Sequence, residues 1–494
     1  MKTAGFDNQQ YLQTQSARIR ERIEQFGGKL YLEFGGKLFD DYHASRVLPG
    51  FEPDSKIRML YELRDSAEIV IPINASAIEQ NKVRGDLGIT YQEDVLRLID
   101  AFRSKGLYVS SVVITQYAGQ GGADAFRRRL TSLGMRVYLH YPIAGYPHNV
   151  SHIVSEEGFG KNDFIETTRP LVVVTAPGPG SGKMATCLSQ LYHEYRRGVV
   201  AGYAKFETFP VWNLPLKHPI NLAYEAATAD LNDVNMIDPF HLSAYGVTTV
   251  NYNRDVEVFP VLQAIFEQIM GSSPYRSPTD MGVNMVGNCI MDDKVCCDAS
   301  LQEIVRRYYS ALCDRRRGSG SDETVFKLEL LMKQAGITDE IRPVIAAACS
   351  DEERTGLPAV AIELPDGEII LGGTSELMGP SAACLLNALK RLAGIERHYH
   401  VISRSAIEPI QKLKIESLGS RNPRLHSDEI LIALAISAST NPQAALAMQQ
   451  LQLLKDCEAH STVILSGPDA DVYSRLGLHM TCTPKYQTKA LFHR

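Results

Sequence analysis

The sequence predicts an α/β protein with an open, largely parallel sheet, a helical subdomain and a C-terminal α+β domain. Three observations support this prediction. Strand and helix patterns alternate from Glu68 onward, helical spacing prevails after Val199, and a hairpin pattern follows the charged, Gly/Ser-containing stretch 315–324. Alternation is typical of parallel strands joined by crossover helices, whereas hairpins mixed with helices are typical of α+β domains. We therefore predict domains at 1–225, 226–320 and 325–494.

The N-terminal elements follow from their periodicity. Residues 7–26 have the spacing of an amphipathic helix that ends at two glycines. EIVIPINA, YVSSVVITQY and MRVYLHYPI are predicted strands, with helical TYQEDVLRLIDAFRSKG and DAFRRRLTSLG between them. LVVVTA, from Leu171, is a further strand. Open α/β sheets bind ligands at the carboxyl ends of such strands.

A glycine-rich loop follows this last strand, in LVVVTAPGPGSGKMAT. Glycines carry no Cβ, so successive backbone N–H groups can converge on an anion, and the following helix N-terminus adds donors. The lysine supplies a mobile positive charge. We therefore predict an anionic small-molecule ligand, with phosphate or a nucleotide as the bound group. The predicted cradle consists of Gly178, Gly180, Ser181, Gly182 and Lys183.

The loop departs from the common P-loop pattern GxxxxGK[ST] at two positions. Pro177 replaces the first glycine, and Met184 stands where a hydroxyl would ligate Mg²⁺. Thr186 lies about 300° around the helix from Lys183, so it is no simple substitute. The loop is therefore P-loop-like, and whether it binds a Mg-nucleotide or another anion stays open.

Carboxylates downstream of the loop are candidates for chemistry. Asp230 and Asp233 are three residues apart on a predicted helix, and Asp238 and His241 follow closely. Residues at this spacing share a helix face and could act as acid and base. We choose Asp230 and Asp238 as the candidate catalytic residues. The alternative is a solvated helical face.

Composition excludes several classes of function. The net charge of −6 argues against nucleic acid as the main partner. The sequence has neither a membrane-length apolar run nor a secretory h-region, which predicts a cytoplasmic protein without a membrane partner. The nine cysteines include no CxxC, and the adjacent Cys296 and Cys297 cannot easily reach one zinc, so we predict no metal site. The helical region leads us to expect a homo-oligomer.

Long stretches of the chain resemble a bacterial family known only as an uncharacterised protein family, or domain of unknown function. They include RPLVVVTAPGPGSGKMATCLSQLYHEYRRG, LYLEFGGKLFDDYHASRVLPGF near the start and LHSDEILIALAISAS near the end. The resemblance implies an α/β part with smaller subdomains, and no established activity. Some members carry the label ATP-dependent zinc peptidase. This sequence has no HExxH, and its close histidine pairs, His148 with His152 and His398 with His400, lack a nearby glutamate in helical register.

The sequence therefore predicts an enzyme of unknown specificity that acts on a phosphorylated small molecule or nucleotide. Two alternatives stay open. One is a non-catalytic, nucleotide-sensing or homo-oligomeric assembly protein, in which the same loop binds the ligand. The other is an amide hydrolase, as the peptidase label of the family implies.

Overall fold

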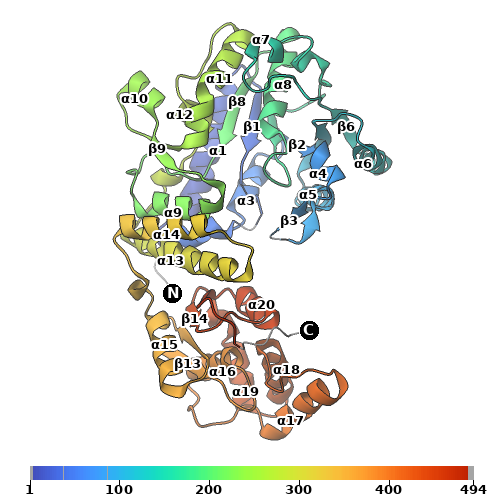
Figure 1. Cartoon of the computed structure of the whole chain (residues 1–494). Helices are drawn as coiled ribbons and strands as arrows, with labels where there is room; N and C mark the ends of the chain where they lie inside the picture. The colour runs from blue at the N-terminus through green and yellow to red at the C-terminus, as the bar shows by residue number, and fades with distance from the viewer. Residues whose placement is uncertain (1–3, 37, 40, 86, 488–494) are drawn as a thin grey trace. The chain divides into compact units, whose positions relative to one another are not determined.

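The computed structural model describes residues 4–36, 38, 39, 41–85 and 87–487, and these form two compact units (Figure 1). The N-terminal unit contains 4–225 and 232–299. The C-terminal unit contains 226–231 and the chain from 300 onward. Residues 232–299, assigned from the sequence to a helical subdomain, thus pack with the N-terminal sheet. Both units combine helices and sheet, which confirms the predicted α/β fold class.

The N-terminal unit is built on a seven-stranded sheet whose neighbours are all parallel. The strand order is β11-β8-β1-β7-β2-β5-β6. The chain runs outward from β1 to β6, returns to insert β7 between β1 and β2, and then adds β8 and β11 beyond β1. The strands are β1 (Leu30–Phe34), β2 (Ala67–Asn74), β5 (Tyr108–Thr115), β6 (Arg136–Leu139), β7 (Leu171–Val174), β8 (Gly202–Phe206) and β11 (Gly282–Val283).

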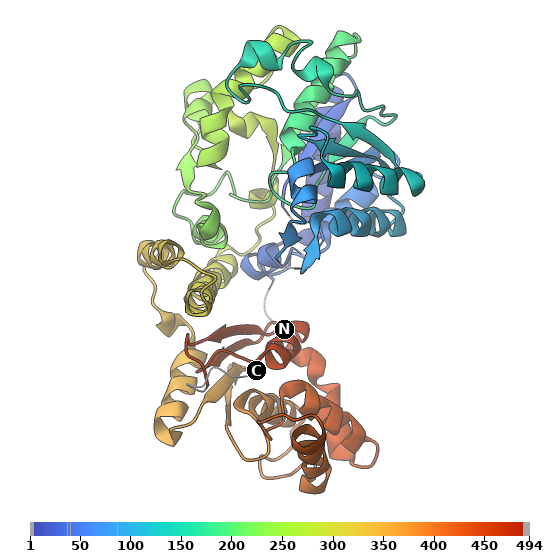
Figure 2. The same ribbon diagram turned by 45° about the vertical axis from the view of Figure 1, so that its right-hand side comes forward.

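Helices cover both faces of this sheet (Figure 2). Right-handed crossovers place helices on opposite faces when the chain moves in opposite directions along a sheet. Accordingly α5 packs on β2 and β5, whereas α8 packs on β1, β7 and β8 and contacts α11. The helices are α1 (Asn8–Gln25), α2 (Tyr42–Val47), α3 (Ser55–Glu62), α4 (Ala75–Glu79), α5 (Tyr91–Ser104), α6 (Gly121–Ser132), α7 (Val150–Ile153), α8 (Lys183–Arg196), α9 (Pro219–Ala227), α10 (Pro239–Tyr245), α11 (Asn253–Met270) and α12 (Pro278–Met281).

Local sequence explains why these elements begin where they do. The Asp7 side chain accepts from the N–H of Gln10 at the start of α1, and Thr90 forms a reciprocal capping box with Glu93 at the start of α5. Strand β7 is the continuous apolar run LVVV and is wholly buried, as expected for a central parallel strand. The reversal of chain direction at β7 creates a switch point, where open α/β sheets bind ligands.

Two short antiparallel pairs complete the N-terminal unit, β3 (Val83–Arg84) with β4 (Ile89–Thr90) and β9 (Asn235–Ile237) with β10 (Val250–Tyr252). Single-turn 3-10 segments lie at Phe159–Lys161 and Val286–Asn288. Among the described residues, no helix is long and apolar enough to cross a membrane.

The C-terminal unit has a mixed four-stranded sheet in the order β13-β12-β14-β15. Strands β12 (Ala359–Glu363) and β13 (Ile369–Gly373) form the predicted hairpin, with Gly367 in the left-handed region at φ 84°. Strands β14 (Glu458–Ser461) and β15 (His479–Cys482) are parallel. The helices are α13 (Asp293–Arg317), whose first turns belong to the N-terminal unit, α14 (Asp322–Ala335), α15 (Pro343–Thr355), α16 (Pro380–Leu392), α17 (Arg404–Lys412), α18 (Ser427–Ala438), α19 (Pro442–Gln449) and α20 (Gly467–Arg475).

Candidate functional site

The parallel sheet brings the glycine loop and the end of β8 to the same edge. In the strand register, Glu33 of β1 lies level with Val174 of β7 on one side and with Lys205 of β8 on the other. Because adjacent strands lie about 4.8 Å apart, the Cα atoms of Val174 and Lys205 are separated by about 10 Å. The segments that follow β7 and β8 therefore both begin at the carboxyl edge of the sheet, close to each other.

The glycine loop is fastened to the protein through its carbonyl groups. The Thr115 hydroxyl donates to the carbonyl of Ser181 at 2.9 Å, and the Asn74 side chain donates to that of Gly180 at 3.3 Å. The Ser181 hydroxyl closes the loop by donating to the Gly178 carbonyl at 2.9 Å. Within the described residues, the N–H groups of Gly180 to Lys183 donate to no protein acceptor. The loop therefore leaves its donors free for an anion.

Two of the glycines cannot be replaced without disturbing the loop. A Cβ on Gly178 would lie 2.3 Å from the Tyr91 hydroxyl oxygen. Gly182 has φ 90° and is the N-cap of α8, with no side chain capping the helix. These positions need glycine for close packing and for a left-handed backbone. The sequence prediction of a tight, side-chain-free turn is consistent with this geometry.

Lys183 begins α8 and carries the positive charge of the loop. Among the described residues, no carboxylate lies within ion-pair distance of its ammonium group. The hydroxyl of Thr186 donates to the Gly182 carbonyl at 2.9 Å, inside the first turn of the helix. Thr186 is thus engaged with the backbone and does not replace the hydroxyl that a conventional P-loop presents to Mg²⁺.

A buried cluster of charges lies at the end of β8. Lys205 donates to Asp255 at the start of α11, lies close to the Tyr252 hydroxyl, and pairs with Glu207 at 3.0 Å between Nζ and Oε1. Burial raises the pKa of Glu207 to about 7, with the charge of Lys205 opposing and that of Asp255 reinforcing the shift. Burial lowers the pKa of Lys205, but the charges of Asp255, Glu207 and Tyr252 outweigh it and hold that pKa well above the ordinary value.

Glu33 of β1 acts on both this cluster and α8, the helix that follows the glycine loop. The Tyr203 hydroxyl donates to Glu33 at 2.7 Å, and the charge of Glu33 also acts on Lys205. Burial raises the pKa of Cys187 in α8, Glu33 raises it further, and Lys183 lowers it. Glu33 and Lys183 are therefore both close to Cys187. The charge of Glu33 is therefore felt both at the Lys205 cluster and in α8.

Comparison with known proteins places the chain in a family. Its residues 4–336 match the model described as "Domain of unknown function DUF1846, N-terminal", and residues 340–492 match the corresponding C-terminal model. The chain belongs to this family. A UPF0371 protein of Streptococcus pneumoniae strain JJA is 60% identical to it over 494 residues, which is all of both chains. UPF0371 protein str1377 of Streptococcus thermophilus strain CNRZ 1066 is 59% identical over the same length. The predicted resemblance is confirmed.

In this DUF1846 protein, Asp238 occupies a fully engaged position. It is the N-cap of α10, where one oxygen accepts from the N–H groups of Phe240 and His241, both at 3.0 Å. The other oxygen accepts from the N–H of Thr279 at 3.2 Å and from its hydroxyl at 2.6 Å. These are the contacts of a helix cap. A catalytic role for Asp238 stays a prediction.

Asp230 and Asp233 do not share a helix face as predicted, because α9 ends at Ala227, before both residues. Asp230 is exposed in a 3-10 turn of the C-terminal unit, and Asp233 is buried against Arg254 at 2.7 Å. Sequence reasoning missed Lys205 and Glu207. A signal was present, because GYAKFET places charged residues within an otherwise apolar strand pattern. A charge in such a strand must find a partner, and a functional site is one reason to bury it.

Two hollows of the N-terminal unit lie away from the glycine loop. One, of about 560 Å³, lies where β1, β7 and β8 begin and includes Lys29 and Arg169. The other, of about 630 Å³, lies beside β11 and includes Arg18, Trp212 and His241. Gly180 is exposed, with open space around it. Neither of these two hollows is lined by a residue of the glycine loop.

Proposed function

We propose that this DUF1846 protein is an enzyme that acts on a phosphorylated small molecule or a nucleotide. The ligand's anionic group binds at Gly178 to Lys183, and Glu207 serves as the general acid–base group. One observation supports this most: an acid with a pKa of about 7 follows a strand whose end is only about 10 Å from the end of the strand that carries the loop. A group that titrates near neutral pH can both accept and donate a proton.

Each residue of the cluster has a distinct part in this proposal. The free N–H groups of the loop and Lys183 hold the anion in the ground state. Lys205 carries a permanent positive charge because Asp255 pairs with it. Burial and the negative charge of Asp255 keep Glu207 partly protonated at neutral pH. Lys205 can therefore stabilise negative charge that develops on a substrate while Glu207 moves a proton.

The anion site is tested by Lys183→Ala. Loss of one charge-assisted contact should weaken binding of ATP, ADP or pyrophosphate by about 1.5–3 kcal/mol without unfolding the protein. Isothermal titration calorimetry measures this directly. Lys161→Ala is the matched control, because Lys161 is an exposed lysine of the same unit paired with Glu157. Equal affinities of wild type and Lys183→Ala for every one of these anions would reject the loop as the site.

The acid–base role is tested by Glu207→Gln. Turnover of phosphorylated substrates found by activity screening should be lost, while their affinity stays nearly unchanged, because the loop supplies ground-state binding. Asp238→Asn distinguishes the alternative drawn from the sequence. If Asp238→Asn abolishes turnover in a folded protein and Glu207→Gln does not, the assignment to Glu207 is wrong and Asp238 regains the role.

A non-catalytic nucleotide sensor is the second candidate function. It is favoured by the loop's lack of a free hydroxyl after Lys183, since Met184 stands there and Thr186 bonds to the backbone. Such a protein would bind nucleotides through Lys183 but turn over none of them, and Glu207→Gln would be without effect on binding. Light scattering with and without nucleotide tests the accompanying prediction of a homo-oligomer.

A further inference from the structure

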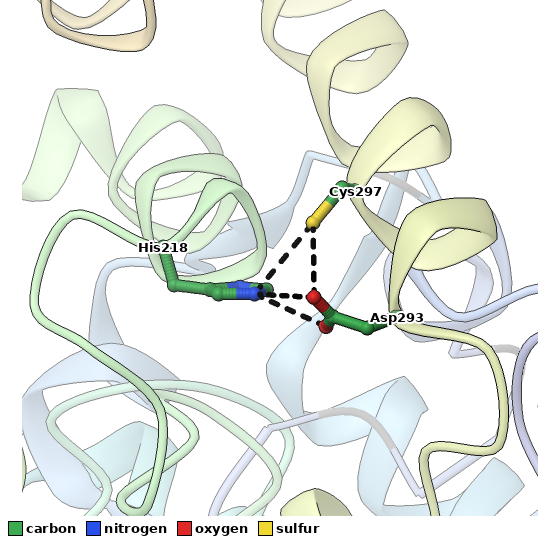
Figure 3. A group of neighbouring side chains, drawn as sticks. All are labelled: His218, Asp293 and Cys297. Carbon is green, nitrogen blue, oxygen red and sulfur yellow. Dashed lines mark hydrogen bonds and ion pairs between the residues drawn. The ribbon is translucent and has the colours of Figure 1, made fainter.

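Two segments that are distant in the sequence bring three side chains together beside the β8 and β11 end of the sheet. His218 lies just before α9, in the segment that follows β8, and Asp293 and Cys297 lie in the first turns of α13, in the segment that follows β11. Asp293 and Cys297 are four residues apart and so share a helix face. Figure 3 shows the three side chains pointing toward one another.

The distances between their polar atoms match those of a tetrahedral ligand set. His218 Nε2 lies 3.4 Å from Asp293 Oδ2 and 3.6 Å from Cys297 Sγ, and Sγ lies 3.7 Å from the same Oδ2. With metal–nitrogen and metal–oxygen bonds of about 2.1 Å and metal–sulfur bonds of about 2.3 Å, tetrahedral angles separate ligand atoms by about 3.3–3.6 Å. One ion can therefore contact all three atoms with little movement.

Without an ion, the three side chains are joined by hydrogen bonds in which the Nε2–H of His218 and the thiol of Cys297 both donate to Asp293. Asp293 and Cys297 both approach the same ring nitrogen of His218, which carries at most one proton. A cysteine nucleophile would need its carboxylate on the opposite nitrogen, Nδ1. That nitrogen instead faces the N–H of Ile220 at 3.3 Å. A cation bound by the three side chains would replace the thiol proton and the Nε2 proton, and the ring proton would then lie on Nδ1, where the contact with the Ile220 N–H would be lost.

The segments that carry the three side chains are tied together. The Asn284 side chain, directly after β11, donates to the carbonyls of Thr208 and Pro210, which follow β8, at 3.3 and 2.9 Å. His218 is held at 10% side-chain exposure, whereas 61% of the Asp293 side chain is exposed. The protein therefore holds His218 in a buried position, and the three side chains are accessible to solvent on the side of Asp293.

We infer that His218, Asp293 and Cys297 bind a divalent transition-metal ion, with zinc as the preferred ion, and leave a fourth position open. Thiolate and imidazole ligands favour zinc over Mg²⁺ or Ca²⁺. Three protein ligands with a solvent-accessible fourth position are typical of catalytic rather than structural zinc. The inference goes beyond the proposed function, because none of the three residues belongs to the glycine loop or to the Lys205 cluster. It reverses the prediction of no metal site, which rested on sequence spacing.

Titration of the chelator-treated full-length chain with Zn²⁺ tests the site. Calorimetry and elemental analysis should find one ion per chain. Cys297→Ser, His218→Gln and Asp293→Asn should each weaken binding by at least about tenfold, since even changes behind metal ligands cost that much. Asp298→Asn and Cys349→Ser are the controls, because they remove an exposed neighbouring carboxylate and a thiol of the other unit.

Cobalt(II) provides a readout that does not depend on affinity alone. The bound ion should show a thiolate charge-transfer band in wild type and Cys349→Ser but not in Cys297→Ser, with circular dichroism confirming that each variant is folded. Absence of Zn²⁺ binding by wild type, or equal binding by wild type and all three ligand variants, would overturn the inference. Lys183→Ala and Glu207→Gln should bind Zn²⁺ like wild type, so failure of the metal site and failure of the anion site are told apart.

Discussion

The two compact units bury charge differently. In the N-terminal unit, Lys205 faces the carboxylates of both Asp255 and Glu207, so acids outnumber their cation. In the C-terminal unit, Arg342 and Arg306 both pair with Glu458, so cations outnumber this acid. In the first cluster two acids share one cation and the pKa of Glu207 is raised to about 7, whereas in the second Glu458 has two cations. The buried charges of the N-terminal unit are candidates for chemistry. Those of the C-terminal unit hold its elements together, and we call the contacts of Arg342 with Glu458 and the neighbouring strands the Arg342 joint.

The Arg342 joint is closed by hydrogen bonds to the backbone. The guanidinium donates to Glu458 at 2.6 Å and to the carbonyls of Ala459 and His479 at 3.2 and 3.1 Å. These acceptors belong to the adjacent strands β14 and β15. Arg342 is 1% exposed and precedes α15, so it ties that helix to the sheet.

The largest expected effect follows from breaking this joint. Arg342→Ala should lower the free energy of unfolding of the C-terminal unit by about 2–4 kcal/mol, because two backbone carbonyls lose a buried donor and Glu458 keeps only Arg306. Denaturant unfolding, followed by hydrogen exchange in β14 and β15, measures the change. Arg354→Ala removes an exposed arginine paired with Asp351 and should cost less than about 1 kcal/mol. Similar losses in both variants would mean that the joint contributes little.

Sequence alone predicts the fold class better than the site. The apolar periodicity that indicates helices and strands is local, whereas the pairing of strands that builds the site joins residues far apart in the sequence. LVVV and its neighbours indicate parallel strands and the position of the glycine loop. Nothing local shows that β7 inserts between β1 and β2. The approach of Glu33 to Lys205 depends on that pairing, and His218 meets Asp293 across 75 residues. The sequence also does not show that Asp230 lies exposed in a 3-10 turn or that Asp238 is the N-cap of a helix.

An intermediate loss of stability is expected at acid pH in the C-terminal unit, where His460 is buried. Burial, with the charges of Arg342 and Lys485, lowers the pKa of His460 to about 3. The pKa of this histidine in the unfolded chain is about 6.5, so between about pH 3 and pH 6.5 the unfolded chain binds more protons than the folded protein. Stability therefore falls as pH drops below about 6.5. The loss from this group should reach about 2 kcal/mol at pH 5.

His460→Gln should remove this part of the acid sensitivity, since an amide can still bond to Thr481 and Thr483, the partners of the imidazole. Unfolding free energies at pH 7 and pH 5 give the comparison. His398→Gln, which changes an exposed histidine, should retain the wild-type pH dependence. If His460→Gln also retains it, the imidazole is not kept neutral by burial.

The smallest expected effect concerns Glu207. Its folded pKa of about 7 lies above the unfolded value of about 4.3, so the folded protein binds more protons between them. The stability that Glu207 contributes is therefore complete below about pH 4 and is lost as pH rises through about 7. Glu207→Gln resembles the protonated form, so at about pH 4, where the wild-type carboxyl is largely protonated in both states, it should change the free energy of unfolding by less than about 1 kcal/mol. It should also flatten the fall in stability between pH 5 and 8.

Denaturant unfolding of the N-terminal unit between pH 4 and pH 8 measures both quantities. Asp255→Asn is the matched variant, because it removes the carboxylate to which Lys205 donates most closely and should cost more at pH 7 than Glu207→Gln. If Glu207→Gln instead costs as much as Arg342→Ala at every pH, Glu207 is an ordinary structural partner of Lys205. The contrast between the two units would then disappear, and with it the reason to place proton transfer at the end of β8.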